Sequence, residues 1–276
     1  MPDGIYHFHL GDFSGTVFRD AIDTRPLEFL TTSVSNQEVS QALESLGLPG
    51  DRVFLSYNIL LLERDGERTL VDAGLMQMEG RQGDLVKRLR EEGIQPETIK
   101  RILITHTDYD HVGGLISSDG HLFFPSAQIL MTRDAWDWYH SEDVLAKIDP
   151  KVAEFFRKLF PIITDHVVFV GGEQEIIPGV CTISTPGHRP GHIALEIISQ
   201  GQTLLHFGDA INNPIFVIRP EWLVKIDTFP EQGRNTRKAL FKRAADENAL
   251  VFAAHPTFPG LGRITRKGDA FQWSFV

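Results

Sequence analysis

One short segment of the sequence concentrates groups that can bind a metal ion. Residues 106–111 read His-Thr-Asp-Tyr-Asp-His, so four imidazole or carboxylate side chains lie within six residues. Such groups packed together would repel one another or stay unsatisfied unless a cation neutralised them. A solvated surface loop is the alternative, but the segment follows the apolar run Ile-Leu-Ile-Thr and precedes the apolar pair at 115–116. The pattern therefore favours a metal site.

Four more Asp or His residues follow apolar runs elsewhere in the chain. In α/β proteins, binding and catalytic groups collect where strand ends meet loops, because rigid strands aim the side chains. Any one of these residues alone could equally be a turn former or a helix N-cap. Together with 106–111 they predict one shared, metal-lined cleft. These residues are Asp72 after TLV, His188 after CTISTPG, Asp209 after TLLHFG and His255 after ALVFAA.

The elements that must position these residues are short strands mixed with helices. The apolar runs are rich in Val, Ile, Leu and Phe and are closed by Gly, Pro, Asp or His, which is typical of buried strands. Three segments have helical spacing, and 231–248 carries a stripe of Ala239, Leu240, Ala244 and Ala245. The class is therefore α/β or α+β. We expect strands at 53–62, 69–71, 101–105, 128–131, 167–170, 180–184, 193–198, 203–207 and 249–253, and helices at 84–92, 150–159 and 231–248.

The whole chain, 1–276, is expected to be a single domain, because no linker, low-complexity tract or repeat divides it. Its tail predicts a hairpin turning at 267–268. The 37 acidic residues against 27 basic ones give a net charge of −10, which argues against a nucleic-acid partner. No apolar stretch reaches the roughly 18 residues needed to span a membrane, and the start does not resemble a signal peptide. One cysteine, Cys181, fits a reducing compartment, so we expect a cytoplasmic protein.

The five motifs resemble, in order, those of the metallo-β-lactamase superfamily. The usual motif of that family is His-x-His-x-Asp-His, followed by single His, Asp and His ligands. The final third, from GDAINNP to GDAFQW, is further similar to the branch that contains methyl parathion hydrolase and related esterases and lactonases. The resemblance implies a four-layer αββα sandwich with two divalent metal ions at one edge. One ion would be held by His106, residue 108 and His188, the other by Asp110, His111 and His255, with Asp209 bridging both.

Asp108 departs from this pattern, because the family has a histidine at that position. Three outcomes are open: the loop moves closer, a water intervenes, or the first ion binds weakly. With three ionised ligand carboxylates, two divalent ions and a hydroxide, the site would be neutral, whereas a histidine at 108 would leave one positive charge. We therefore expect a less electrophilic site. Zinc is the expected metal by family, and iron or manganese become plausible because carboxylates suit harder ions.

The function implied is a hydrolase that uses a metal-activated water to cleave an ester, lactone or phosphotriester. Asp110 would orient that water or accept its proton, and Asp72 and His192 would orient ligating histidines. Trp136, Trp138 and Tyr139 fall where this branch places aromatic residues near its pocket, although packing is the alternative for each of them. A non-haem di-iron oxidoreductase or dioxygenase is the rival activity, and a binding protein that lost catalysis is a third possibility. The expected partner is a small-molecule substrate, and related hydrolases are often homodimers.

Overall fold

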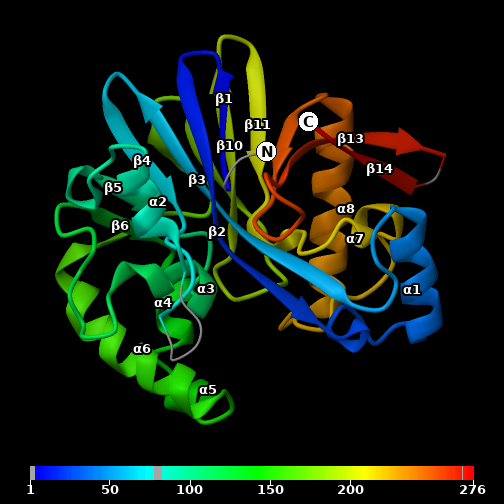
Figure 1. Ribbon diagram of the computed structural model, residues 1–276, viewed down its shortest axis with the longest axis horizontal. Coiled ribbons are helices and arrows are strands. Elements are labelled where there is room, and N and C mark those ends of the chain that lie inside the picture. The colour runs from blue at the N-terminus through cyan, green and yellow to red at the C-terminus, as the bar shows by residue number, and fades with distance from the viewer. Residues whose placement is uncertain (1–3, 78–82, 269) are drawn as a thin grey trace.

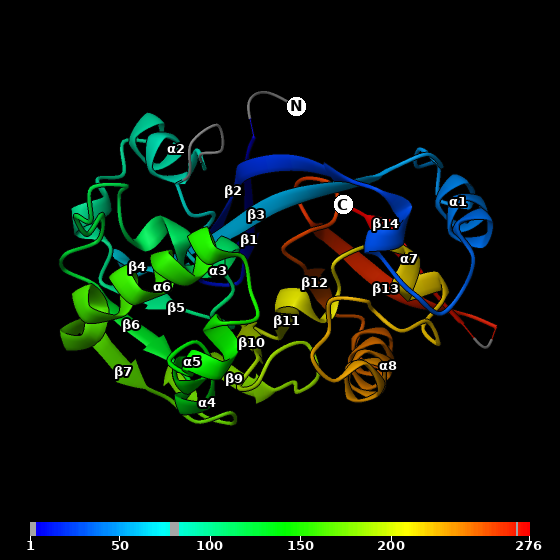
Figure 2. The same cartoon turned by 90° about the horizontal axis from the view of Figure 1, so that it is seen from below.

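Two seven-stranded sheets packed face to face form the centre of the molecule. The computed structural model describes residues 4–77, 83–268 and 270–276. Helices lie on the outer side of each sheet (Figure 1, Figure 2). The architecture is the αββα sandwich that the sequence predicts.

The first sheet has the order β1-β2-β3-β4-β5-β6-β7. Neighbouring strands are antiparallel from β1 to β4 and parallel from β4 to β7. Parallel neighbours send their carboxyl ends to the same edge of the sheet, where the loops can meet. The strands are β1 (Ile5–Leu10), β2 (Phe13–Arg25), β3 (Val53–Arg64), β4 (Glu67–Val71), β5 (Arg101–Leu103), β6 (Gln128–Met131) and β7 (Val167–Phe169).

The second sheet has the order β14-β13-β12-β11-β10-β9-β8. Only β11 and β12 are parallel neighbours; the other pairs are antiparallel. The predicted hairpin is present, because β13 and β14 pair at the outer edge of the sheet and Gly268 turns between them with φ of 60°. The strands are β8 (Glu175–Ile177), β9 (Val180–Ser184), β10 (Ile193–Ser199), β11 (Gln202–His206), β12 (Leu250–Phe252), β13 (Leu261–Lys267) and β14 (Ala270–Phe275).

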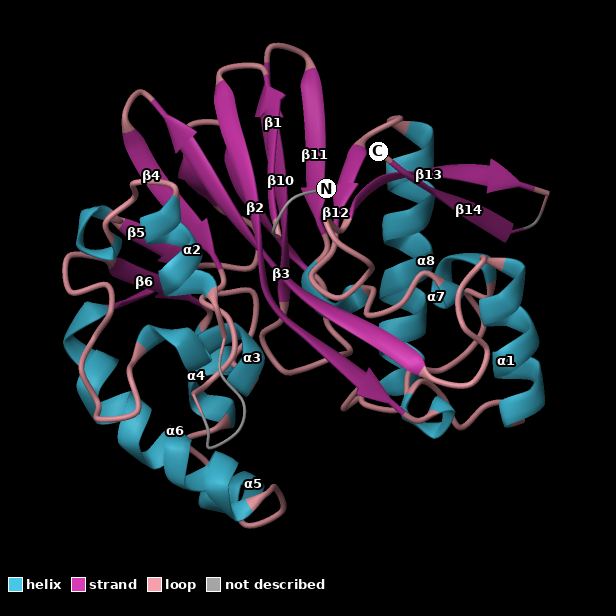
Figure 3. Ribbon diagram, viewed as in Figure 1, coloured by secondary structure: helices cyan, strands magenta, loops and turns pink. Residues whose placement is uncertain are grey.

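The outer layers are helical, as the cyan ribbons of Figure 3 show. Helices α2 and α6 pack on the first sheet, and α8 packs on the second. None of the helices in the described ranges combines the length and hydropathy needed to cross a lipid bilayer. The helices are α1 (Asn36–Ser45), α2 (Leu85–Glu91), α3 (Tyr109–Val112), α4 (Arg133–Trp138), α5 (Glu142–Leu145), α6 (Pro150–Ile163), α7 (Ile215–Ile218) and α8 (Pro230–Asp246).

The central strands are apolar on both faces, because each face lies against another layer. On β3, Leu61 packs toward the helices, whereas Leu60 and Leu62 pack between the two sheets. On β12, Val251 faces α8 and Phe252 faces the first sheet. Alternation would leave one face polar, so continuous apolar runs are what this layered arrangement requires.

The structure contains elements that the sequence did not predict, such as the helices α1, α4, α5 and α7. Two further differences concern β2 and α8. The long strand β2 was not predicted, because Gly15, Asp20 and Asp23 interrupt its apolar pattern. In α8 the predicted stripe is shifted: Ala239 is exposed, and the buried face includes the side chain of Arg237. An arginine on a buried helix face requires a charged or polar partner, which the site supplies.

Candidate metal centre

Loops at one edge of the two sheets bring the predicted metal ligands together. Residues 106–111 follow β5 of the first sheet. From the second sheet, His188 follows β9, Asp209 lies in the turn after β11, and His255 follows β12. All of these side chains are buried except that of Asp110, which is half-buried. The site therefore lies at the seam between the two halves of the sandwich.

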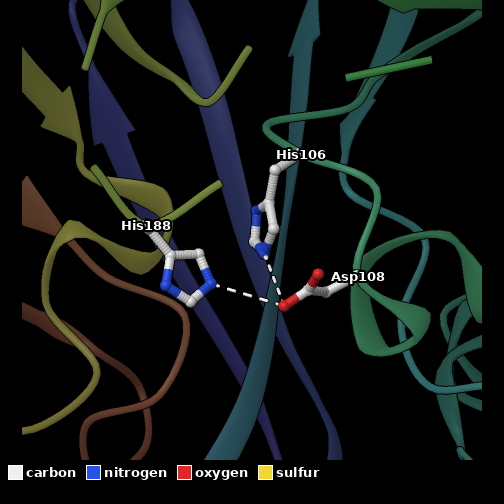
Figure 4. A group of neighbouring side chains, drawn as sticks. All are labelled: His106, Asp108 and His188. Carbon is white, nitrogen blue, oxygen red and sulfur yellow. Dashed lines mark ion pairs between the residues drawn. The ribbon is translucent and has the colours of Figure 1, made fainter. Parts of the chain in front are cut away.

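The first group of side chains consists of His106, Asp108 and His188. Oδ2 of Asp108 lies 3.7 Å from Nε2 of His106 and 3.4 Å from Nε2 of His188. Figure 4 shows both rings directed at the same oxygen of this carboxylate. Ligands of a four-coordinate zinc ion lie about 3.4 Å from one another, so these separations suit three ligands of one ion. Of the three outcomes open for Asp108, the geometry matches a loop close enough for direct contact.

The second group consists of Asp110, His111 and His255. Oδ2 of Asp110 lies 3.5 Å from Nε2 of His255 and 3.9 Å from Nε2 of His111. Asp209 lies between the two groups. Its Oδ1 is 3.2 Å from Nε2 of His111, and its Oδ2 is 3.1 Å from Nε2 of His255 and 3.6 Å from Nε2 of His188. The shared position of Asp209 is the one that a bridging ligand would require.

The chemistry of this donor set fits metal ions. Nε2 of His106, His111 and His188 and Oδ1 of Asp209 are buried and make no hydrogen bond within the described part of the chain. Burial lowers the pKa of His111, but Asp209 and Asp72 outweigh it and raise the pKa well above its ordinary value. The carboxylates thus favour a positive charge at the centre, and a divalent ion supplies that charge while satisfying the inward-facing atoms.

The outer nitrogen of each candidate histidine is held by the protein. Nδ1 of His106 lies 3.1 Å from the hydroxyl of Thr105, and Nδ1 of His255 lies 3.1 Å from the carbonyl oxygen of Ser56. With Nδ1–H donated outward, the lone pair of Nε2 points into the centre, which is the tautomer that a metal requires.

Asp72 occupies the corresponding position behind His111. Its Oδ2 accepts from Nδ1 of His111 at 2.8 Å, and its two oxygens also accept from the backbone N–H and the hydroxyl of Thr105. Asp72 itself has a φ of 62°, a left-handed conformation that costs energy for a residue other than glycine. The strain is consistent with a carboxylate held in place to orient a ligand.

His192 contacts both the Asp209 loop and the ring of a candidate ligand. Its Nε2 accepts the backbone N–H of Asp209 at 3.1 Å, and its Nδ1 lies 2.8 Å from the hydroxyl of Thr185. Gly208 allows this close approach, because a Cβ there would lie 2.7 Å from Nε2 of His192. His192 therefore supports the loop that carries the shared carboxylate, and its ring also packs against that of His106, with the centroids 5.1 Å apart.

Asp108 has two partners that sequence reasoning did not assign to it. Arg189 forms a two-pronged ion pair with it, from Nε to Oδ1 at 2.8 Å and from Nη2 to Oδ2 at 2.7 Å. The hydroxyl of Tyr139 donates to Oδ1 at 2.7 Å. Burial raises the pKa of Asp108, but Arg189 and the two histidines outweigh it and hold the pKa well below its usual value. The signals in the sequence were the position of Arg189 directly after His188 and the aromatic segment with Tyr139, which the resemblance placed near the pocket.

Arg189 also changes the charge balance of the centre. When only the ligands, the two ions and a hydroxide are counted, the site with Asp108 is neutral. A site with a histidine at 108 would have a net charge of +1. The guanidinium of Arg189 restores that positive charge at the carboxylate itself. The reason for expecting a less electrophilic site therefore does not hold.

A small pocket of about 130 Å³ opens onto the second group. Asp108, Asp110, Asp209 and His255 form its floor. Its walls are mostly apolar or aromatic, a composition that suits an acyl or ring-shaped substrate. The wall residues are Arg25, Phe29, Leu55, Tyr57, Tyr109, Arg189, Asn212 and Ile226.

Comparisons with known proteins agree with this fold. An N-acyl homoserine lactonase of Bacillus thuringiensis is 24% identical over 196 residues, which are 68% of each chain. The structure of AidC, a dizinc quorum-quenching lactonase in complex with a product, superposes with a TM-score of 0.89 at 23% identity over 99% of this chain and 97% of that one. The hydrolase AbOPH of the β-lactamase superfamily gives 0.90 at 24% identity over 100% and 98%. The metallo-β-lactamase superfamily profile matches residues 52–255, and the chain belongs to that superfamily.

Proposed function

We propose that the protein is a dinuclear metal-dependent hydrolase that opens lactones or cleaves carboxylic esters. The observation that carries the proposal is the pair of ligand groups that share Asp209 beneath a small, largely apolar pocket. The relatives named as lactonases support the lactone within this class. When bound, the two ions would activate a water molecule and polarise the substrate carbonyl.

The residues of the chain have separate roles in this reaction. Asp110 is the half-buried carboxylate at the pocket floor, so it would hold the attacking water and accept its proton. Phe29, Leu55 and Ile226 in the pocket wall would exclude bulk water from the acyl group. Asp72 and His192 would keep His111 and the Asp209 loop in place, because each makes its hydrogen bond to them from outside the centre.

Zinc is the metal we propose for both positions. The candidate ligands are His106, His111, His188 and His255, with Asp108, Asp110 and Asp209, and imidazole-rich sets of this kind suit zinc. Iron and manganese are the alternatives that elemental analysis distinguishes. The redox alternative was motivated by the carboxylate ligand at position 108, and it is not favoured because the relatives are named as lactonases, one of them a dizinc enzyme.

The test is hydrolysis of a panel of N-acyl homoserine lactones, simple carboxylic esters and a phosphotriester. Proton release measures the hydrolysis. We expect ring opening of at least one lactone, loss of activity with a chelator and recovery with Zn²⁺. His111→Ala should abolish turnover, whereas His121→Ala, which changes an exposed histidine, should leave it unchanged. Undiminished turnover by a metal-free or His111→Ala protein would refute the proposal.

Two further parts of the proposal concern the cell and the assembly. Cys181 as the single cysteine supports a cytoplasmic location. A homodimer stays a prediction, which light scattering of the purified protein tests.

A further inference from the structure

The carboxylate of Asp108 has one lone pair left for an ion. Oδ1 accepts two hydrogen bonds, from Tyr139 at 2.7 Å and from Nε of Arg189 at 2.8 Å. Oδ2 accepts from Nη2 of Arg189 at 2.7 Å, and the same oxygen faces His106 and His188. A carboxylate oxygen offers about two lone-pair directions, so Oδ1 is saturated and Oδ2 keeps one direction for the centre.

The guanidinium of Arg189 is itself fixed. Its Nη1 donates to the carbonyl oxygens of His188 at 2.9 Å and Ile226 at 2.6 Å, and lies 3.3 Å from the hydroxyl of Thr228. These contacts and the two to Asp108 use four of the five N–H donors of the guanidinium. Arg189 is therefore anchored to the backbone of its own loop and to that of Ile226.

We propose that Asp108 and Arg189 act as one unit that replaces the neutral histidine of the family, with Asp108 binding the first ion through Oδ2 alone. Arg189 and Tyr139 are positioning residues in this arrangement, since they act through Asp108. The inference rests on the proposed dinuclear centre. It assigns to this chain a first metal position at which the charge of the ligand Asp108 is balanced by Arg189.

The pairing makes each single substitution costly. If histidine replaced Asp108 alone, Arg189 would stay beside the ion as an unpaired, largely buried cation. If a neutral residue replaced Arg189 alone, Asp108 would lose two of the three hydrogen bonds that aim Oδ2 at the first ion, and only the one from Tyr139 would remain. The double substitution removes both charges and returns the position to the ordinary histidine. The two residues should therefore be coupled in metal affinity.

The experiment measures zinc per chain by elemental analysis of folded protein equilibrated with limiting free Zn²⁺, and the absorption spectrum after Co²⁺ substitution. We expect two ions for the parent protein and about one for Arg189→Gln and for Asp108→His. The double variant Asp108→His/Arg189→Gln should regain the second ion. Arg157→Gln, which removes an exposed arginine paired with Glu142, is the matched control and should keep two.

Two further variants separate geometry from charge. Arg189→Lys keeps the charge but loses the fork, and it should bind the first ion at least tenfold more weakly than the parent does. Tyr139→Phe preserves stacking on Phe156 while removing one donor to Oδ1, and it should change the Co²⁺ spectrum. Two tightly bound ions in both Arg189→Gln and Arg189→Lys, or a double variant no better than the single ones, would overturn the inference. A parent protein with no bound metal would instead overturn the proposed function.

Discussion

His188 is linked through Asp227 to a buried arginine on the outer helix. Nδ1 of His188 lies 3.0 Å from Oδ1 of Asp227, and Oδ2 of Asp227 lies 2.9 Å from Nη1 of Arg237. All three side chains are buried. Arg237 also donates to the carbonyl oxygen of Trp222 at 3.1 Å. The positive charge of Arg237 on α8 therefore holds Asp227 in place, and Asp227 in turn orients the ring of His188, a candidate metal ligand.

The first prediction concerns Asp227→Asn. The amide keeps the size of the side chain but removes the negative charge that holds Nδ1–H of His188 and neutralises Arg237. Zinc affinity should fall by about 10- to 100-fold, as is common when the partner of a ligating histidine is changed. Competition with a chromophoric chelator measures this affinity.

The control for this change is Asp246→Asn, at an exposed ion pair with Arg266. It should leave zinc affinity unchanged, because exposed pairs contribute about 0–1 kcal/mol and lie far from the centre. Equal affinities for parent and Asp227→Asn would show that Asp227 does not orient His188.

A second prediction reverses the usual effect of alanine in a helix. Gly233→Ala in α8 should gain about 1 kcal/mol from helix propensity. However, a Cβ at Gly233 would lie 2.4 Å from Oδ2 of Asp227, so that buried carboxylate would have to move. We expect a lower free energy of unfolding in urea together with weaker zinc binding. Asn235→Ala, at an exposed position of the same helix, should be neutral or stabilising; a stabilised Gly233→Ala protein would contradict the argument.

A third prediction separates stability from activity at Asn212. This buried amide lines the pocket, and its Nδ2 and Oδ1 make no hydrogen bond within the described ranges. Asn212→Leu, which keeps the branching of the side chain at Cγ, should raise the free energy of unfolding by about 1 kcal/mol, because it removes buried polar atoms. It should also lower kcat/KM on the best lactone roughly tenfold if the amide meets the substrate. A destabilised variant with full activity would be the opposite of both expectations.

A fourth prediction concerns acid stability. His206 is buried against Phe252, and burial lowers its pKa to about 4 from 6.5, so the fold excludes the proton that the unfolded chain binds. The resulting stability is complete above pH 6.5 and is lost as the pH falls toward 4. Between pH 6.5 and 5 the loss is on the order of 2 kcal/mol. His206→Gln should show a smaller loss than the parent when metal-free proteins are unfolded in urea at both pH values; parallel losses would exclude His206 as the cause.

Much of the fold was predictable because the central strands are buried on both faces. Runs such as 53–62 and 193–198 are almost wholly apolar, which a local pattern reveals at once. By contrast, β2 carries the buried carboxylate of Asp20, which accepts backbone N–H groups of Leu75 and Leu85. Its polar residues are explained only by contacts with distant segments, so a local pattern could not reveal the strand.

The candidate site also has a part that the sequence could predict and a part that it could not. The segment 106–111 is dense enough to be recognised alone, whereas the partners of its side chains are scattered along the chain. Asp108 meets Tyr139 and Arg189, and His188 meets Asp227, across 31, 81 and 39 residues of sequence. Such pairings depend on how loops fold over one another, and no spacing rule encodes them.

The seam position of the centre also sets an order for biosynthesis. The first candidate ligands leave the ribosome at residues 106–111, but Asp209 and His255 follow only when most of the second sheet has been made. A nascent chain could therefore hold an ion only loosely until translation has passed residue 255. Final metal loading is thus a late event, and it reports that both halves of the newly made protein have joined.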